Sequence, residues 1–347
     1  MGEAKFLLSK KKLLEQLSIL KNLDLKISYS YKTNHEVGDL LQNISDCDFS
    51  IHELNELNGI KDKSKIWFFL QAESYKDFLD ILDLGVRNFV VDNNVDLKNL
   101  LNIIMEKKIV INLSLRMKLQ EHRVGSGKYF VYGMSSREIN NIVKEIKDNS
   151  FIGKLGVHIH RKSQNTSEWN AKSEIEDSLN KETLKRINFL NIGGGLPVKY
   201  KSYGADILKY IFEKILEIKN FLESEEIETY IEPGRFLAAP AIKLTTEIIQ
   251  IQEKNIVINT TIYNCALDTL LTGTKMLIDD ELNEDEEGET YLIKGNSPTR
   301  DDIFRYNVKL NSPNIGDKIV FLNAGAYNYT TDFFGNVKLK TEIVEDF

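Results

Sequence analysis

Two segments of the sequence place reactive side chains directly after short apolar runs. Lys32 follows the run Ile27–Tyr31 in the segment Tyr31-Lys32-Thr33-Asn34. A lysine at the end of a buried strand must be paired or lose its proton, and an unprotonated amine can form a Schiff base with a carbonyl cofactor. The alternative is a lysine that reaches solvent at the start of a loop.

The second segment contains His158 and His160, at the end of the run 155–160. Residues i and i+2 face the same side of a strand, so the pair could bind a metal, or one ring could stack on a flat ligand. The chain has five histidines and no further His or Cys cluster to complete a zinc site. For His158, an ordinary packed position in the core is a further alternative.

Two more segments have groups that suit an anion. Gly193-Gly194-Gly195 follows the apolar run 189–192, and successive glycines let backbone N–H groups approach a phosphate closely. Glu232-Pro233-Gly234-Arg235 follows the run 229–231. An arginine there suits a phosphate, a glutamate suits a protonated ring nitrogen, and a surface ion pair is the alternative.

Together the four segments offer an amine, a partner for a flat ring, a phosphate-binding turn and a carboxylate with an arginine. These groups match the aldehyde, ring, phosphate and ring nitrogen of pyridoxal 5′-phosphate. The combination therefore predicts that cofactor, and it predicts no metal.

The positions of these residues depend on a repeated pattern of strand and helix. Helical periods lie between most of the short apolar runs, the clearest running from Ile207 to Leu216. Such alternation is typical of parallel βαβ units, and eight units in about 200 residues favour a closed (β/α)8 barrel, whose chemistry lies at the C-terminal ends of the strands. The eight predicted strands are Ile27–Tyr31, Cys47–Ser50, Ile66–Leu70, Phe89–Asp92, Ile109–Arg116, Leu155–His160, Phe189–Ile192 and Thr229–Glu232.

The pattern changes after Pro240, where β-rich runs follow one another without long helices. We therefore predict a barrel over residues 22–240 and an all-β domain made of 1–21 and 241–347, with Phe6–Leu8 as a possible strand. The predicted C-terminal runs are Ile242–Gln252, Ile256–Tyr263, Thr290–Lys294, Lys318–Asn323 and Val337–Val344.

Composition narrows the functional classes. The 347 residues are 42% hydrophobic and 28% charged, with a net charge of −7, which is ordinary for a globular protein. A negative balance argues against general nucleic-acid or anionic-membrane binding. No apolar stretch approaches the length of a membrane span. The two cysteines, Cys47 and Cys265, cannot form a disulfide framework, and a cytoplasmic location is expected.

The motifs resemble, in order and over nearly the whole chain, those of the ornithine/diaminopimelate/arginine decarboxylase family of fold-type III pyridoxal-phosphate enzymes. The resemblance implies Lys32 as the Schiff-base residue. It implies that His160 stacks on the ring and that Glu232 pairs with the ring nitrogen. It implies that the phosphate is held by Ser163, Gly193, Gly194, Gly195 and Arg235, with Gly234 as a further cofactor-binding residue. In the family's His-x-Gly-Ser motif, Lys162 replaces the glycine.

Weaker matches complete the resemblance. Asp48 and Glu53 fall near a family Asp and Glu, although the spacing is one residue short, and Arg116 ends its strand as a family Arg does. The resemblance thereby implies Asp48 and Arg116 as cofactor-binding residues. Gly325-Ala326-Tyr327 is similar to a Gly-Ala-Tyr motif that implies Tyr327 near the phosphate. The implied fold is a TIM-type barrel with a C-terminal β domain, as in alanine racemase. The implied assembly is a homodimer with shared active sites.

The resemblance fails at one place. The family's Gly-x-x-Cys segment, with an Asp four residues later, corresponds to Gly295–Asp302, and Pro298 occupies the position of the Cys. That Cys is the expected proton donor after carbon dioxide leaves. Lys32, His160, a water and Thr299 are the alternatives, and the hydroxyl of Thr299 is a weak acid.

The implied activity is decarboxylation of a basic or carboxylated amino acid, in polyamine or lysine biosynthesis. The distal end of the substrate would meet charges drawn from Asp268, Arg300, Asp301 and Asp302, any of which could equally be a solvated loop charge. The missing Cys keeps a second hypothesis open, a racemase-like or regulatory protein that does not decarboxylate. A metal-dependent hydrolase barrel is the remote third.

Overall fold

The computed structural model describes residues 2–119, 132–204 and 206–347. They form two compact units, which we call the barrel unit (Leu20–Leu196 and Ile207–Pro233) and the sheet unit (Met1–Ile19, Pro197–Asp206 and Gly234–Phe347). This division groups residues 197–206 and 234–240 with the sheet unit, whereas the sequence prediction assigned them to the barrel. The domain boundaries drawn from the sequence stay a prediction.

Eight parallel strands close the barrel, each hydrogen-bonded to the next and the last to the first. This confirms the predicted fold class, and every predicted barrel strand overlaps an observed one. The strands are β2 (Lys26–Ser30), β3 (Asp48–Ile51), β4 (Ile66–Phe69), β5 (Asn88–Val91), β6 (Ile111–Arg116), β7 (Ile152–His158), β8 (Phe189–Asn191) and β9 (Glu228–Ile231).

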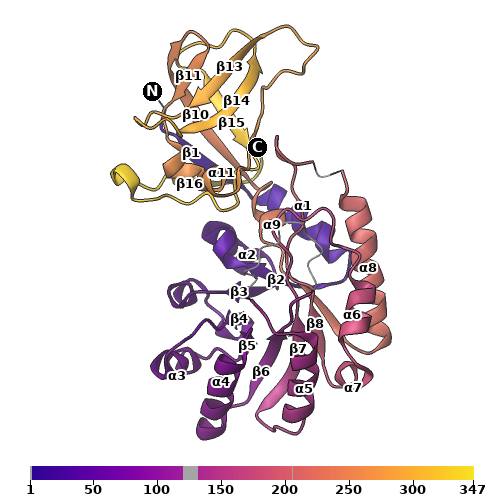
Figure 1. The fold of residues 1–347 in the computed structure, drawn as a ribbon. Helices are drawn as coiled ribbons and strands as arrows, with labels where there is room; N and C mark the ends of the chain where they lie inside the picture. The colour runs from indigo at the N-terminus through magenta and orange to yellow at the C-terminus, as the bar shows by residue number, and fades with distance from the viewer. Residues whose placement is uncertain (1, 120–131, 205) are drawn as a thin grey trace. The chain divides into compact units, whose positions relative to one another are not determined.

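Helices of the barrel unit lie outside these strands (Figure 1). Their starts are set by side chains that bond exposed backbone N–H groups: Ser74 and Ser135 form capping boxes, and Asn93 accepts from two N–H groups. The helices are α2 (His35–Ile44), α3 (Tyr75–Asp83), α4 (Asn94–Lys107), α5 (Ser136–Ile146), α6 (Lys172–Ser178), α7 (Lys181–Leu184) and α8 (Leu208–Ser224).

Large side chains fill the interior of the barrel. Trp67, Phe69, Val90 and Phe189 form one buried cluster, against which Tyr230 packs. The ring centroids of Trp67 and Phe189 lie 4.9 Å apart. The interior is therefore a packed core, and in barrels of this kind the ligand site lies at the C-terminal ends of the strands.

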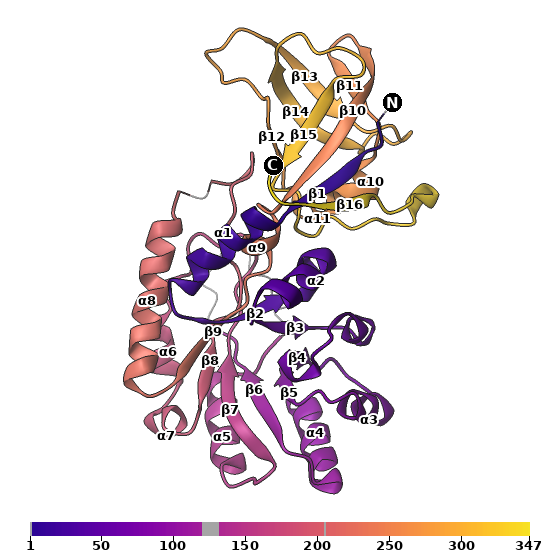
Figure 2. The same cartoon turned by 180° about the vertical axis from the view of Figure 1, so that it is seen from behind.

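The sheet unit is built on a mostly antiparallel sheet with the strand order β12-β15-β10-β11-β13-β14. β1 pairs antiparallel with β10 and parallel with β16, so the first and last strands of the chain lie side by side (Figure 2). The strands are β1 (Lys5–Ser9), β10 (Ile242–Gln252), β11 (Asn255–Ile258), β12 (Leu277–Ile278), β13 (Glu289–Lys294), β14 (Ile303–Leu310), β15 (Lys318–Leu322) and β16 (Lys340–Val344).

One predicted strand is too long. The run Ile256–Tyr263 is a strand only as far as Ile258, because the Thr261 hydroxyl accepts from the Tyr263 N–H and begins a helical turn. The α-helices not yet named are α1 (Lys10–Lys21), α9 (Arg235–Ala238), α10 (Ile262–Cys265) and α11 (Leu267–Thr272).

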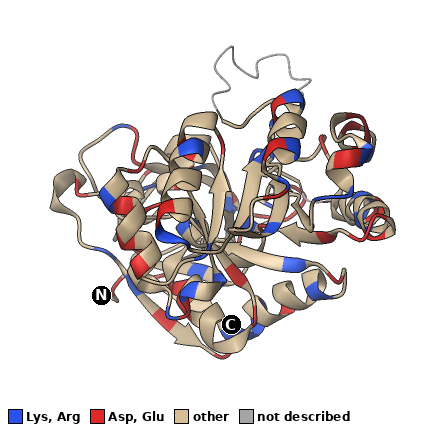
Figure 3. Ribbon diagram, turned by 90° about the horizontal axis from the view of Figure 1, so that it is seen from below, with Lys and Arg blue, Asp and Glu red and all other residues tan. Residues whose placement is uncertain are grey.

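Charges of both signs are interspersed along the elements, with 45 Lys and Arg against 52 Asp and Glu in the chain (Figure 3). Among the described residues, no helix combines the length and the apolar character that crossing a membrane requires.

Candidate active site

Four of the sequence-predicted residues follow the C-terminal ends of barrel strands. Lys32 lies in a 3-10 turn (Tyr31–Thr33) directly after β2, and Glu232 directly follows β9. His160 and Gly193 each lie two residues beyond the ends of β7 and β8. Because all eight strands are parallel, these residues lie at the same end of the barrel.

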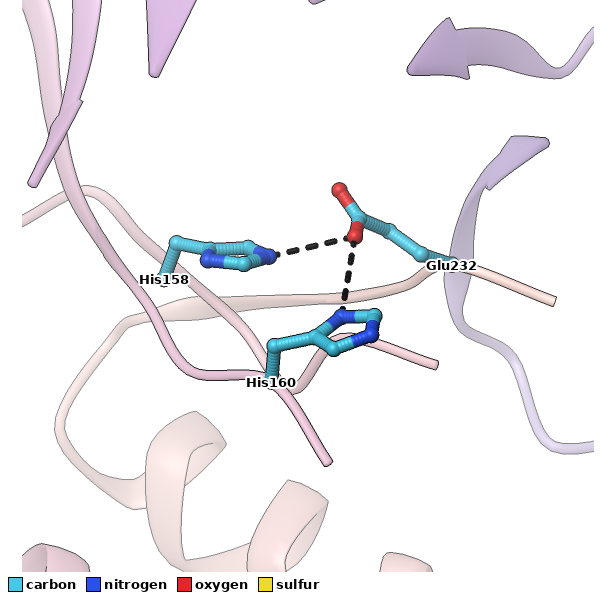
Figure 4. Close-up of side chains that lie close together, drawn as sticks. All are labelled: His158, His160 and Glu232. Carbon is cyan, nitrogen blue, oxygen red and sulfur yellow. Dashed lines mark hydrogen bonds and ion pairs between the residues drawn. The ribbon is translucent and has the colours of Figure 1, made fainter. Parts of the chain in front are cut away.

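The carboxylate of Glu232 is the centre of this group, and Glu232 is only 3% exposed. Its Oε1 accepts from Ser50 Oγ at 2.8 Å and from Asn191 Nδ2 at 2.9 Å. Its Oε2 lies 3.1 Å from His158 Nε2 and 3.7 Å from His160 Nδ1 (Figure 4). Burial works to raise the pKa of Glu232, but the two histidines bring it well below its ordinary value. The carboxylate is therefore ionised at neutral pH.

The two histidines face the same side of their strand, as the spacing predicted. Their ring centroids lie 5.9 Å apart, and His158 also packs edge-on against Phe69. Burial lowers the pKa of both rings, in spite of the neighbouring carboxylate. His158 is fully buried, so it combines the core position foreseen as an alternative with a contact to Glu232.

The same three residues bear on the question of a metal. One ligand atom from each of His158, His160 and Glu232 lies within 4.8 Å of the others. The absence of a metal from the functional protein therefore stays a prediction.

Lys32 lies in an environment that favours its unprotonated form. Solvent reaches its side chain, yet the pKa of Lys32 is lowered, chiefly by burial of the ammonium group. Glu232 acts in the opposite direction, and Arg116 at the end of β6 adds repulsion. The pKa of His52 is lowered well below its ordinary value by burial and by Lys32. A lowered pKa makes more of the lysine available as a nucleophilic amine.

The glycine turn after β8 passes so close to its neighbours that larger residues would not fit. Gly193 has φ +71°, and a Cβ there would lie 2.2 Å from the carbonyl oxygen of Ile159. A Cβ at Gly194 would lie 2.7 Å from the oxygen of Glu232, and one at Gly195, with φ +107°, 2.8 Å from that of Lys162. The turn is therefore wedged between the chain segments that follow β7 and β9.

Other predicted ligands occupy different places. Asp48 begins β3 and accepts from Trp67 Nε1 at 3.1 Å, so it lies at the N-terminal end of the barrel, away from Glu232. Ser163 is exposed in the segment after β7, and Gly234 is the N-terminal cap of α9. The ligand roles predicted for these three residues stay predictions.

The predicted phosphate ligand Arg235 belongs to the sheet unit, where it forms a buried ion pair. Its Nη1 and Nη2 donate to the two carboxylate oxygens of Asp268 at 2.6 and 3.0 Å, and Nη1 also donates to the hydroxyl of Tyr200. The guanidinium lies 5.1 Å from the ring centroid of Tyr327, whose backbone has φ +57°. Asp268 is 4% exposed, so this geometry supports a structural role rather than the predicted contact with a substrate.

The loop from Gly295 to Asp302 separates the predicted substrate residues. Asp302 is fully buried, and its carboxylate accepts from the N–H groups of Ile262 and Ser297 and from the Ser297 hydroxyl. Arg300 and Asp301 pair with each other at 3.3 Å and are exposed. Of the three charges, only Arg300 and Asp301 are therefore open to a ligand.

Neither cysteine provides an accessible acid. Cys265 is fully buried and donates to the carbonyl of Thr261, and burial raises its thiol pKa to about 12. Cys47 is buried beside Ser45, and burial raises its pKa as well. At the loop position, Pro298 has no acidic proton, and the Thr299 hydroxyl donates to Tyr263 Oη at 3.2 Å.

Sequence reasoning missed two residues of the group, Ser50 and Asn191. Asn191 Oδ1 accepts from the Gly193 N–H at 2.8 Å while its Nδ2 donates to Glu232. Ser50 bonds both Glu232 and Ser28. Their position in the sequence could have indicated a role in the site, because both are polar residues in short, largely apolar barrel strands.

Comparison with known proteins identifies the family. The model of the pyridoxal-dependent decarboxylase family, pyridoxal binding domain, matches residues 12–239. The chain belongs to this family, which confirms the resemblance found in the sequence, and pyridoxal phosphate is the cofactor of the family.

Individual relatives are distant. The chain is 30% identical over 174 residues to a diaminopimelate decarboxylase of Buchnera aphidicola, covering 42% of this chain and 41% of that protein. It is 26% identical to the diaminopimelate decarboxylase of Haemophilus influenzae, covering 82% of this chain and 72% of the relative. The first two relatives, the second from Archaeoglobus fulgidus, are thus matched over only 41% and 36% of their own length.

Solved structures share the fold of the whole chain. Diaminopimelate decarboxylase from Helicobacter pylori, complexed with L-lysine, superposes with a TM-score of 0.85 at 20% identity, covering 100% of this chain and 93% of that one. Lysine/ornithine decarboxylase from Vibrio vulnificus, complexed with cadaverine, gives a TM-score of 0.81 at 20% identity, covering 99% and 95%. These similarities establish the barrel with a β domain.

Proposed function

We propose that this chain is a pyridoxal-phosphate-dependent amino-acid decarboxylase that holds its cofactor through Lys32. The observation that supports this most is the buried, ionised carboxylate of Glu232, bonded by Ser50 and Asn191 at the barrel end where Lys32 lies. A buried charge is costly unless it has a partner, and a protonated ring nitrogen is the partner that the family's cofactor offers.

The described residues fit that cofactor by their chemistry. Lys32 offers an amine with a lowered pKa, and Glu232 offers a carboxylate that stays ionised. His160 offers a flat ring next to that carboxylate. The turn Gly193–Gly195 is held where only glycine fits. When bound, the cofactor supplies an electron-accepting ring that takes up the electron pair left by carbon dioxide.

In this function Glu232 keeps a proton on the ring nitrogen. Ser50 and Asn191 both bond Oε1, so the acceptor position left for the ring nitrogen would be on Oε2, beside its contact with His158 Nε2. His158 Nε2 contacts Oε2 of Glu232 and fixes the position of that oxygen. His160 would cover one face of the ring and exclude water there.

Lys32 is also the group best suited to donate the proton that replaces carbon dioxide at the same carbon. Its lowered pKa brings the ammonium closer to neutrality, where a general acid is most effective. His160 is poorer, because its lowered pKa leaves it unprotonated. The hydroxyl of Thr299 is a far weaker acid than either.

Cofactor binding is tested by colour. Purified protein should absorb at about 420 nm. Borohydride should bleach that band and leave the cofactor covalently attached to Lys32, which mass spectrometry detects. Lys32→Ala should lose both signals, while Lys154→Ala, which removes an exposed lysine paired with Glu228, should keep them. A colourless protein whose activity depends on zinc would instead support the metal hydrolase.

The substrate we propose is a basic or carboxylated amino acid, and diaminopimelate should be tested first. Five relatives are named diaminopimelate decarboxylases. The panel is diaminopimelate, lysine, ornithine and arginine, with carbon dioxide and amine both measured by mass spectrometry. Yellow protein that releases no carbon dioxide from any of them would refute the decarboxylase and favour a protein that does not decarboxylate.

We also propose a homodimer in the cytoplasm. The dimer is supported by exposed apolar side chains of the sheet unit, Leu271, Phe333, Phe334 and Val337 among them, since such side chains are more often covered in an assembly. Sedimentation equilibrium should give twice the 39.9 kDa chain mass, and a monomer at micromolar concentration would contradict it.

A further inference from the structure

Arg161, the residue after His160, has a buried guanidinium that the proposed mechanism does not use. The residue is 3% exposed, and its guanidinium lies 4.7 Å from the ring centroid of the fully buried Trp169. Its Nε donates to the carbonyl oxygen of Glu168 at 2.8 Å, and its Nη1 donates to that of Ile192 at 3.0 Å. Its Nη2 is buried and has no hydrogen-bond partner among the described residues.

These contacts fix Arg161 against the glycine turn. Ile192, whose carbonyl it bonds, immediately precedes Gly193. At the other end of the turn, a Cβ on Gly195 would lie 3.2 Å from Arg161 Cβ, and the Asn165 N–H donates to the Gly195 carbonyl at 2.9 Å. The segment from Arg161 to Asn165 therefore wraps the turn, with the guanidinium behind its first residue.

The charge of Arg161 is balanced differently from that of Arg235. The Nε and Nη1 groups of Arg161 donate to carbonyl oxygens, whereas Arg235 donates to both oxygens of Asp268. Guanidinium groups stay protonated in proteins, and burial strengthens the field of a charge. The nearby carboxylates of Glu168 and Glu174 work to raise the pKa of Arg161, but neither accepts one of the hydrogen bonds just named. Burial lowers the pKa of Arg161 to about 10, which still leaves it charged at neutral pH.

We propose that Arg161 provides the fixed positive charge of an anion site at the turn Gly193–Gly195, and that it thereby selects a phosphorylated ligand over the same ligand without phosphate. The proposal rests on the proposed function in one respect, that the phosphate of pyridoxal phosphate is the anion. Arg161 acts through the turn as a positioning residue.

The test compares the affinity of cofactor-free protein for pyridoxal phosphate and for pyridoxal, measured by absorbance titration. Arg161→Gln should weaken the binding of pyridoxal phosphate at least tenfold and change the affinity for pyridoxal less than twofold. Arg161→Lys keeps the charge and should keep the ratio of the two affinities within about threefold of wild type. Arg186→Gln is the control. Arg186 pairs with Glu182 and lies before β8, whereas the glycine turn comes after the other end of that strand.

The outcomes separate the possible explanations. Equal weakening of both ligands would show that Arg161 only supports the fold, and an unchanged ratio in Arg161→Gln would also overturn the proposal. If Arg161→Gln does not fold, Arg161→Lys decides, because a ratio that falls tenfold despite the retained charge refutes the charge role. If neither ligand turns the wild-type protein yellow, the proposed function is refuted instead.

Discussion

Asn191 ties the carboxylate of Glu232 to the glycine turn. Its Nδ2 donates to Glu232 Oε1 at 2.9 Å, and its Oδ1 accepts from the Gly193 N–H at 2.8 Å. The carboxylate would hold the ring nitrogen and the turn would hold the phosphate of one cofactor. Asn191 therefore fixes the spacing between the two ends of the proposed ligand.

Replacing Asn191 should weaken cofactor binding more than replacing Ser50. Asn191→Ala removes a bond to Glu232 and a bond to the turn, and loss of a hydrogen bond to a charged group typically costs about 1.5–3 kcal/mol, or about 10- to 100-fold in affinity. Ser50→Ala removes a donor to Glu232 and a bond to the Ser28 hydroxyl, and it leaves the glycine turn untouched. Titration of cofactor-free protein with pyridoxal phosphate gives both affinities. An equal loss in the two variants would show that the bond to Gly193 contributes nothing.

Gly193→Ala should prevent the turn from forming. A Cβ there meets the Ile159 carbonyl oxygen at 2.2 Å, and the backbone has φ +71°. Gly273 has nearly the same φ, +73°, with nothing within 4 Å of its Cβ. In urea unfolding, Gly273→Ala should therefore lower the free energy of unfolding only by the backbone strain, about 1 kcal/mol. Gly193→Ala should lower it clearly more. Similar losses would mean that the chain around Ile159 can move aside.

The barrel could be predicted from the sequence because each of its strands is a short apolar run between helical periods. Ile66–Leu70 and Phe189–Ile192 were each found within about one residue of β4 and β8. In the sheet unit, β14 was not predicted, because the buried Arg305 and the exposed Tyr306 and Asn307 interrupt its apolar pattern. Tyr263 was placed in a strand, because the capping role of Thr261 depends on local geometry.

The site was predictable where a residue's chemistry is unusual for its place, as with Lys32 and Glu232. It was not predictable where the partner comes from a distant part of the chain. The pairing of Arg235 with Asp268 joins residues 33 positions apart, and each of the two charges was predicted to contact a ligand instead. Ser50 and Asn191 were missed because a single Ser or Asn in a strand has many structural uses.

Neutralising Asp268 should destabilise the protein rather than simply weaken a substrate. Asp268→Asn leaves the buried guanidinium of Arg235 without its counter-charge, which typically costs about 3–5 kcal/mol. Asp301→Asn is the control, because Asp301 and Arg300 form an exposed pair whose loss typically costs at most about 1 kcal/mol. Urea unfolding measures both. A raised KM with unchanged stability in Asp268→Asn would restore the substrate role predicted from the sequence.

The stability of the cofactor-free protein should fall as the pH drops below about 6.5, the ordinary pKa of histidine. Burial lowers the pKa of His52, His158 and His160 in the folded barrel. The unfolded chain therefore binds protons that the folded chain refuses, and each histidine costs up to about 1.4 kcal/mol per pH unit between its unfolded and its folded pKa. Glu232, whose folded pKa is also lowered, loses its contribution in the same direction below about pH 4.5.

The histidine contribution can be isolated from the slope of stability against pH. Urea unfolding of the cofactor-free protein at pH 7.5, 6.5 and 5.5 should show a decline that begins near pH 6.5. His158→Gln removes one titrating ring, so its stability should fall less steeply over this range even though its stability at pH 7.5 is lower, because Glu232 loses the contact with His158 Nε2. A slope equal to that of wild type would mean that His158 takes up its proton in the folded barrel, and that its ring and Glu232 then form a charged pair.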